Sequence, residues 1–147
     1  MIYIGSDHAG YPLKTRLIEY LRENDTEFTD CGCDGETADY PDIAKKVCKN
    51  VLSGKENRGV LICGTGIGIS IAANKINGIR AALCGDYYSA KYTRKHNDAN
   101  VICFGNHVMG AGLACELLEV FLSTGFDGGK HTPRVEKIEK IEKIEQL

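Results

Sequence analysis

A cysteine followed by three closely spaced glycines stands in the stretch GVLICGTGIGISIAANK, residues 59–75. An apolar run leads into Cys63, and glycines at positions 64, 66 and 68 precede a helical pattern. Glycine lets backbone N–H groups come close to a ligand, and the first turn of a helix adds partial positive charge. The spacing therefore predicts that this turn binds an oxyanion or a phosphate.

The position of Cys63 beside the turn indicates proton-transfer chemistry. A thiol near oriented N–H groups loses its proton more readily and acts as a base or a nucleophile. Abstraction of a proton beside a carbonyl needs such a base together with donors for the developing oxyanion. The alternative is that Cys63 only packs at a strand end and that the turn is a plain connection, although three glycines exceed what a connection requires.

Asp7 and His8 follow the first apolar run of the chain, in the sequence SDHAG. In open parallel sheets, ligands bind outside the carboxyl ends of the strands, where the strand order switches. We therefore expect Asp7, His8 and Cys63 to lie at the same edge of a sheet.

A nucleotide site is the competing hypothesis for the glycine turn. Gly64-x-Gly66 follows an expected strand, and Asp86 lies near the usual spacing for a ribose-binding carboxylate. The third glycine of the dinucleotide fingerprint would stand at position 69, however, where the chain has Ile69. A Walker loop is also disfavoured, because no Gly-Lys-Ser/Thr follows.

Short apolar runs alternate with amphipathic stretches, and this order predicts the elements that position these residues. Such alternation is typical of a parallel sheet covered by helices on both faces. The expected fold is a single domain over residues 1–147, a three-layer α/β/α Rossmann-like sandwich with a five-stranded parallel sheet and an extra C-terminal helix. We expect strands at 2–6, 26–31, 58–63, 79–84 and 100–105, and helices near 11–23, 41–53, 67–75, 87–96 and 110–123.

The composition is that of a soluble globular protein, with 43% hydrophobic and 26% charged residues. The net charge of −2 favours neither a nucleic acid nor a membrane as partner. No apolar run approaches the length of a membrane span, and the N-terminus lacks the features of a signal peptide. We therefore expect a cytoplasmic protein.

The chain has seven cysteines, and its one close pair, Cys31 and Cys33, has a spacing that suits neither a redox motif nor a zinc site. In a reducing compartment most cysteines behave as small buried hydrophobic residues. We expect this of every cysteine except Cys63, and we expect no metal site.

The end of the chain is expected to form a helix at about 132–147, because Thr132 and Pro133 suit a helix start. An apolar residue then recurs every three positions, at Ile138, Ile141, Ile144 and Leu147. Such a stripe drifts around a helix of 3.6 residues per turn and suits one that crosses obliquely over another surface. We expect this helix to pack on a dimer partner; the alternative is a solvated tail.

Six segments carry a resemblance to a known family: GSDHAGYPLK, ADYPD, GVLICGTGIGISIAANK, GIRAALC, KHNDANV and GGKHTPRVEKI. They span nearly the whole chain in order, and CGTGIGISIAANK followed by HNDANV is highly specific. The chain resembles the ribose-5-phosphate isomerase B family, which includes galactose-6-phosphate and allose-6-phosphate isomerases.

The resemblance implies an aldose–ketose isomerase that interconverts ribose 5-phosphate and ribulose 5-phosphate through an enediol, without metal or organic cofactor. Cys63 matches the family's base, and His96 matches its ring-opening histidine, with Asn97 beside it contacting the substrate. The family's oxyanion hole matches the turn of Gly64, Thr65, Gly66, Ile67 and Gly68.

Further substrate contacts of the family match Asp7 and His8, and a pocket tyrosine matches Tyr40. Two alternatives stay open. The substrate could be a six-carbon phosphosugar, allose 6-phosphate or galactose 6-phosphate, or the chain could be a phosphosugar-binding module without catalysis.

The phosphate contacts depart from the family pattern at two positions. Relatives often carry arginine where this chain has His107 and Lys130, whereas Arg134 matches. Arginine grips a phosphate with two parallel hydrogen bonds, lysine is a point charge and histidine titrates near neutrality. We expect His8, His107, Lys130 and Arg134 to form the phosphate clamp.

The expected order of elements separates His96 from Cys63. His96 lies between a helix and the next strand and therefore at the amino edge of the sheet, whereas Cys63 and Asp7 lie at the carboxyl edge. A strand of five or six residues separates the edges by roughly 15–20 Å. A symmetric dimer with shared sites resolves this, as the resemblance also implies, so we expect a homodimer or a higher oligomer built from it.

Overall fold

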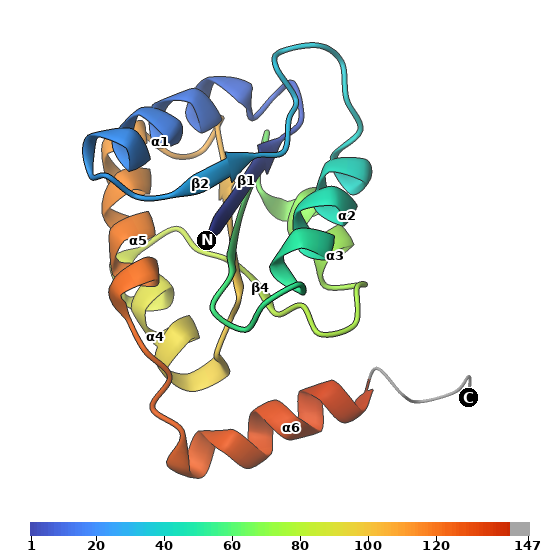
Figure 1. Cartoon of the computed structure of the whole chain (residues 1–147), viewed down its shortest axis with the longest axis vertical. Coiled ribbons are helices and arrows are strands. Elements are labelled where there is room, and N and C mark those ends of the chain that lie inside the picture. The colour runs from blue at the N-terminus through green and yellow to red at the C-terminus, as the bar shows by residue number, and fades with distance from the viewer. Residues whose placement is uncertain (142–147) are drawn as a thin grey trace.

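The computed structural model describes residues 1–141 and places a five-stranded parallel sheet between two layers of helices (Figure 1). The predicted fold class is confirmed. The strands are β1 (Ile2–Ser6), β2 (Phe28–Asp30), β3 (Arg58–Cys63), β4 (Ala81–Leu83) and β5 (Val101–Gly105). The helices are α1 (Tyr11–Glu23), α2 (Tyr40–Val51), α3 (Ile67–Ala73), α4 (Tyr87–Asn97), α5 (Ala111–Ser123), the short 3-10 helix η1 (Gly129–His131) and α6 (Thr132–Ile141).

Helices α1, α4 and α5 cover one face of the sheet, and α2 and α3 cover the other (Figure 1). Successive side chains of a strand point to opposite faces. In β3, Val60 and Ile62 join the core beneath α1 and α5, whereas Leu61 and Cys63 join the core beneath α2 and α3. Burial on both faces explains the continuous apolar run of this strand.

The strand order is β2-β1-β3-β5-β4. From β1 the chain moves outward to β2 and then returns to β3, on the other side of β1. The order thus switches between β1 and β3, which is where open parallel sheets bind ligands. The last residues of these strands, Ser6 and Cys63, both end at this switch point.

The two edge strands, β2 and β4, have three residues each and are shorter than the expected 26–31 and 79–84. The N–H of Thr26 donates to the carbonyl of Leu21 at the end of α1, and the N–H of Arg80 donates to Oδ1 of Asn100. These backbone groups find partners in a turn and in a side chain instead of the ladder. The expected boundaries are wrong here because an edge strand has a neighbour on one side only.

Six of the seven cysteines are buried, Cys115 is partly exposed, and all seven are free. Burial in the apolar core raises the pKa of Cys48 and of Cys84 to about 12. These two thiols are therefore protonated at neutral pH and act as packing groups, as expected of the cysteines other than Cys63.

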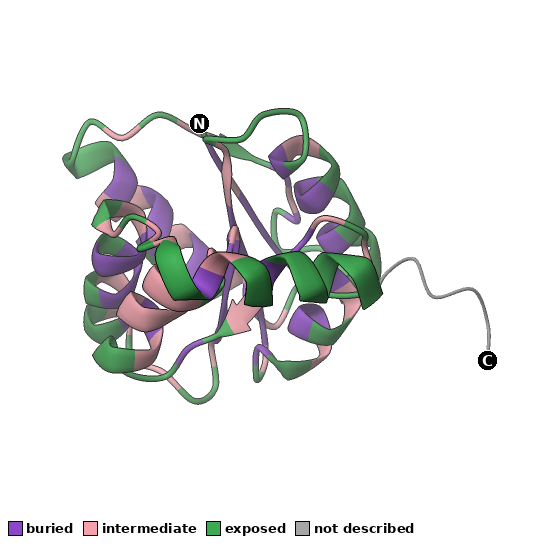
Figure 2. Cartoon of the chain, turned by 90° about the horizontal axis from the view of Figure 1, so that it is seen from below, coloured by how far each residue is buried: buried purple, intermediate pink, exposed green. Residues whose placement is uncertain are grey.

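Helix α6 crosses the amino edge of the sheet, and most of its surface is exposed (Figure 2). Val135 is its buried residue, whereas Ile138 and Ile141 are 41% and 64% exposed. The expected apolar stripe is thus largely uncovered in the single chain; its last members, Ile144 and Leu147, lie outside the described residues. No helix within residues 1–141 is both long and apolar enough to cross a membrane.

Lys14 is a charged residue in the core, with 1% of its surface exposed. Its Nζ donates to both carboxylate oxygens of Asp30, at 2.8 Å each, and to the carbonyl of Cys33, at 2.6 Å. A buried ammonium needs such partners, because it has lost its water. Since Cys33 lies in the loop that leads from β2 to α2, Lys14 fastens this loop to α1.

Replacing Lys14 by Met should destabilise the fold, because Asp30 and the Cys33 carbonyl lose their partner while the apolar stem is kept. We expect a loss of about 2–3 kcal/mol, less than the ~3–5 kcal/mol typical of a fully buried pair, since the Asp30 side chain is 32% exposed. Urea unfolding measures this. The control is Arg16→Met, whose exposed ion pair with Glu19 should contribute under about 0.5 kcal/mol. Equal losses for the two variants would refute the role of Lys14.

Candidate active site

The thiol of Cys63 receives a hydrogen bond from the glycine turn that follows it. Cys63 is the last residue of β3, and its Sγ lies 3.1 Å from the backbone N of Gly66. An N–H directed at sulfur stabilises negative charge there, as a proton acceptor requires. The turn predicted to bind an anion therefore already points one of its donors at the thiol.

This turn requires glycine at position 66. Gly66 has a φ of 77°, in the left-handed region that side chains disfavour. A Cβ there would lie 2.5 Å from Cδ1 of Leu83 and 2.8 Å from the carbonyl carbon of Phe104. The absence of a side chain thus lets the turn bend back on Cys63 and pack against the end of β5.

The loop after β5 holds the glycine turn from the other side. The N–H of Asn106 donates to the carbonyl of Cys63, and the N–H of His107 donates to the carbonyl of Gly64, both at 2.9 Å. The imidazole of His107 is so close that a Cβ on Gly64 would lie 3.0 Å from its Cδ2. His107, expected to contact phosphate, therefore lies beside the turn.

Asp7 and His8 lie at the same edge, directly after β1. The N–H of Asp7 donates to the carbonyl of Ile62, and Oδ1 of Asp7 accepts a 2.9 Å hydrogen bond from the N–H of Gly10. Asp7 is buried, and His8 is exposed with its Nδ1 3.3 Å from the carbonyl oxygen of Ala38. One oxygen of the Asp7 carboxylate thus fixes the turn into α1.

Tyr40 joins this group from the start of α2. Its ring lies against Gly68, where a Cβ would be 2.9 Å from Cζ of the tyrosine, and 40% of Tyr40 is exposed. The carboxyl edge of one chain therefore gathers these of the residues predicted for the site: Asp7, His8, Tyr40, Cys63, Gly64, Thr65, Gly66, Ile67, Gly68 and His107.

A second group of predicted residues lies at the opposite edge. His96 and Asn97 end α4, Lys130 lies in η1, and Arg134 lies in the first turn of α6. The His96 ring stacks on the ring of His131, with centroids 4.1 Å apart and planes 12° from parallel. The ordering of His96 thus depends on the segment that also carries Lys130 and Arg134.

Sequence reasoning did not include His131 among the residues of the site. It is 8% exposed, and burial, followed by the electrostatic influence of His96, Lys130 and Arg134, lowers the pKa of His131. A signal was present, because Tyr88, Tyr92 and His96 recur every four residues and form a ladder of ring contacts along α4. The ladder indicates a site for ring stacking at His96, but its spacing does not say which distant residue supplies the next ring.

The structure does not bring the two groups together within one chain. Strands β3 and β5 pair with Gly59 opposite Val101 and Cys63 opposite Gly105. Because α4 ends just before β5 begins, His96 and Cys63 are separated by the length of the strand, roughly 13 Å over its four steps. The two groups lie at opposite edges, as expected from the order of elements, although four steps give a shorter separation than the roughly 15–20 Å of a five- or six-residue strand.

Asp86, the carboxylate that the nucleotide hypothesis would place on a ribose, already has hydrogen-bond partners within the chain. Oδ1 of Asp86 accepts a hydrogen bond from the N–H of Ser89 at 2.8 Å, and Oδ2 accepts one from its hydroxyl at 2.7 Å. These bonds lower the pKa of Asp86 and make it the N-cap of α4. Within residues 1–141, no group of three or more His, Cys, Asp or Glu side chains is arranged to hold a metal ion.

A thiol and a turn of N–H donors lie together at the switch point of a parallel α/β sheet, and comparison with known proteins identifies the class of protein that carries them. The sequence profile of the ribose/galactose isomerase family matches residues 2–138. The chain belongs to this family and is an aldose–ketose isomerase.

Individual relatives match over nearly the whole chain. The chain is 46% identical over 136 residues to ribose-5-phosphate isomerase B of Escherichia coli, covering 92% of this chain and 91% of that one. It is also 46% identical over 138 residues to D-erythrulose-4-phosphate isomerase of Pectobacterium atrosepticum, covering 92% and 91%. The solved structure of Clostridium thermocellum ribose-5-phosphate isomerase B matches with a TM-score of 0.93 and 49% identity, covering 97% of each chain.

Replacing Gly66 by Ala should impair catalysis, because the new Cβ displaces the turn that faces Cys63. We expect kcat to fall about 10²-fold or more, the loss typical of a misplaced oxyanion donor. The control is Gly112→Ala in α5, where a Cβ meets nothing within 4 Å; it should keep full activity and gain about 0.5–1 kcal/mol in the free energy of unfolding. A folded Gly66→Ala enzyme with the parent's kcat would contradict this role.

Proposed function

We propose that the chain interconverts ribose 5-phosphate and ribulose 5-phosphate, with the thiolate of Cys63 as the base. The observation that carries the proposal is the hydrogen bond from Gly66 to Sγ of Cys63 at the switch point. It is supported by family membership and by the relatives named ribose-5-phosphate isomerase B.

In the proposed reaction the open-chain aldose places its C2 near Sγ. The thiolate removes the C2 proton, the electron pair forms the C1–C2 double bond, and the C1 carbonyl oxygen takes the negative charge. N–H groups of the turn from Gly64 to Gly68 stabilise this oxyanion. The Cys63 thiol then returns the proton to C1, while the hydroxyl proton of O2 leaves and O1 is protonated, which gives the ketose. Base and donors supply both functions, so no metal or organic cofactor is needed.

The remaining roles are assigned to residues around this centre. His96 opens the sugar ring, and Asp7, Tyr40 and Asn97 contact the sugar. The phosphate is bound by a clamp of basic residues that consists of His8, His107, Lys130 and Arg134. Because the clamp and the ring-opening histidine are divided between two edges of the sheet, the complete site needs a second chain.

We therefore propose a homodimer in which His96, Asn97, Lys130 and Arg134 of one chain complete the carboxyl edge of the other. The largely exposed Ile138 and Ile141 on α6 are available to pack on the partner. A symmetric pair gives two equivalent sites.

The sugar length is the open part of the substrate assignment, since a relative of equal identity is named D-erythrulose-4-phosphate isomerase. One carbon more or less in a pocket changes kcat/KM by roughly 10–200-fold. Measuring kcat/KM for ribose 5-phosphate, D-erythrulose 4-phosphate and allose 6-phosphate tests the proposal. A higher value for either of the other sugars would overturn the pentose assignment.

Alkylation of Cys63 should abolish isomerisation, because the base is then blocked. The experiment uses a Cys115→Ser chain, which removes the more exposed thiol. Iodoacetamide should inactivate it in step with modification of Cys63, as peptide mass spectrometry shows, and ribose 5-phosphate should slow both. Full turnover after complete modification of Cys63 would exclude it as the base.

Complementation between Cys63→Ala and His96→Ala tests the shared site. Each variant alone should be nearly inactive, because each of its sites lacks one group. In a mixed dimer one site carries both lesions and the other carries none, so subunit exchange should restore about half of the parent activity per mixed dimer. If native mass spectrometry shows mixed dimers and turnover stays at the level of the variants, the shared-site proposal is wrong.

A further inference from the structure

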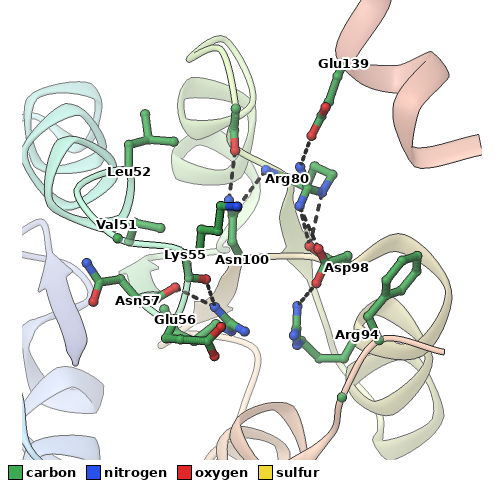
Figure 3. Close-up of a pocket in the computed structure, with 15 residues that line it drawn as sticks. Val51, Leu52, Lys55, Glu56, Asn57, Arg80, Arg94, Asp98, Asn100 and Glu139 are labelled. Atoms are coloured by element: carbon green, nitrogen blue, oxygen red, sulfur yellow. Dashed lines mark hydrogen bonds and ion pairs between the residues drawn. The ribbon is translucent and has the colours of Figure 1, made fainter. Parts of the chain in front are cut away.

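A cavity of about 610 Å³ opens at the amino edge of the sheet, away from Cys63 (Figure 3). Its walls are the segment from the end of α2 to the start of β3, the loop before β4, the end of α4 and the residue Glu139 on α6. Four basic side chains line it, namely Lys55, Arg58, Arg80 and Arg94, and three acidic ones, namely Glu56, Asp98 and Glu139.

Two of the arginines form ion pairs with carboxylates of the cavity wall. Arg80 contacts Asp98 at 3.1 Å and Glu139 at 2.9 Å, and Arg94 contacts the other oxygen of Asp98 at 2.8 Å (Figure 3). Arg94 also donates to the carbonyls of Ala99 and Thr124. Asp98 and Glu139 are thus both occupied by these two guanidinium groups.

Arg58 has no carboxylate within ion-pair distance among residues 1–141. Its Nη1 donates to the carbonyls of Lys55 and Asn57, at 2.9 and 2.8 Å, and the described residues offer no acceptor to its Nε or Nη2. Burial, followed by the positive charges of Arg94 and Arg80, lowers the pKa of Arg58, whereas the negative charges of Asp98 and Glu56 raise it. The half-buried guanidinium therefore carries a positive charge that no ion pair within residues 1–141 neutralises, although Asp98 and Glu56 offset part of it.

Lys55 adds a second cation at the same wall, and its Nζ has no ion-pair or hydrogen-bond partner in the part of the chain that the structure describes. A guanidinium with free N–H groups and a nearby ammonium are the groups that bind phosphoryl oxygens. The cavity volume lies in the range of small-molecule sites. Arg58 and Lys55 thus have both the charge and the space for an anion.

We propose that this cavity is a second anion site, in which Arg58 and Lys55 bind the phosphoryl group of a small molecule. Glu56, which follows Lys55 in the same segment, is the acidic lining residue that forms no ion pair within residues 1–141, and its negative charge weakens the binding of such a ligand. The site is independent of the phosphate clamp at the proposed active site, because it uses none of the clamp residues.

The test is a titration of the ¹⁵N-labelled protein with inorganic phosphate and, separately, with glycerol 3-phosphate, at constant ionic strength. Backbone amides of residues 54–58 report on the cavity, and those of residues 64–68 report on the proposed active site. We expect saturable shifts at residues 54–58 at millimolar ligand, and the tighter ligand shows whether free phosphate or a phosphate ester is preferred. No saturable shift there with either ligand would overturn the proposal.

Variants of the lining residues test which side chains bind the ligand. Arg58→Gln should weaken binding at residues 54–58 about tenfold or more, Arg58→Lys should restore part of it, and Glu56→Gln should tighten it about two- to fivefold. The control, Arg16→Gln on the surface of α1, should change nothing. An unchanged affinity in Arg58→Gln, or a weaker one in Glu56→Gln, would refute the site. Shifts at residues 64–68 and turnover should stay unchanged in Arg58→Gln, so this outcome is distinct from failure of the proposed isomerase reaction.

Discussion

The bend from Cys63 to Gly66 constrains the rest of the site, because it brings three parts of the chain into van der Waals contact with no room for a side chain. Gly66 packs against Leu83 of β4 and the backbone of Phe104 in β5. Only in this packing does its N–H reach the sulfur of Cys63. The position of the Cys63 thiol relative to this turn thus depends on the spacing of neighbouring strands. Backbone hydrogen bonds fix that spacing at about 4.8 Å.

The parallel sheet also dictates how polar residues are distributed. Every strand ends at the same edge, so the residues after β1, β3 and β5 converge there without long loops. Every helix returns at the other edge, which receives His96, the buried ring of His131 and the arginines around Asp98. In the proposed function, chemistry that needs both sets therefore joins two chains.

Helices α1 and α5 could be predicted almost to the residue, because an amphipathic period is a local property that the burial of one face preserves. The ends of the short edge strands β2 and β4 could not be predicted in this way. Where a strand ends depends on which hydrogen-bond partners its backbone groups find in the folded chain. The thiol of Cys63 and the glycine turn could be recognised from the sequence, because they are adjacent along the chain. His131 could not, because its burial depends on a ring contact with His96 from a distant segment.

The sequence by itself determined the alternation of strands and helices, the place of Cys63 beside a glycine turn and the resemblance to a sugar isomerase family. These properties rest on neighbours along the chain. Tertiary structure alone decided which groups share an edge: it set the strand order, divided the predicted site residues and placed Arg58 near Arg94 around a cavity. The physical reason is that charge interactions and burial depend on distances in space. Residues far apart in sequence come close to one another only when the sheet forms.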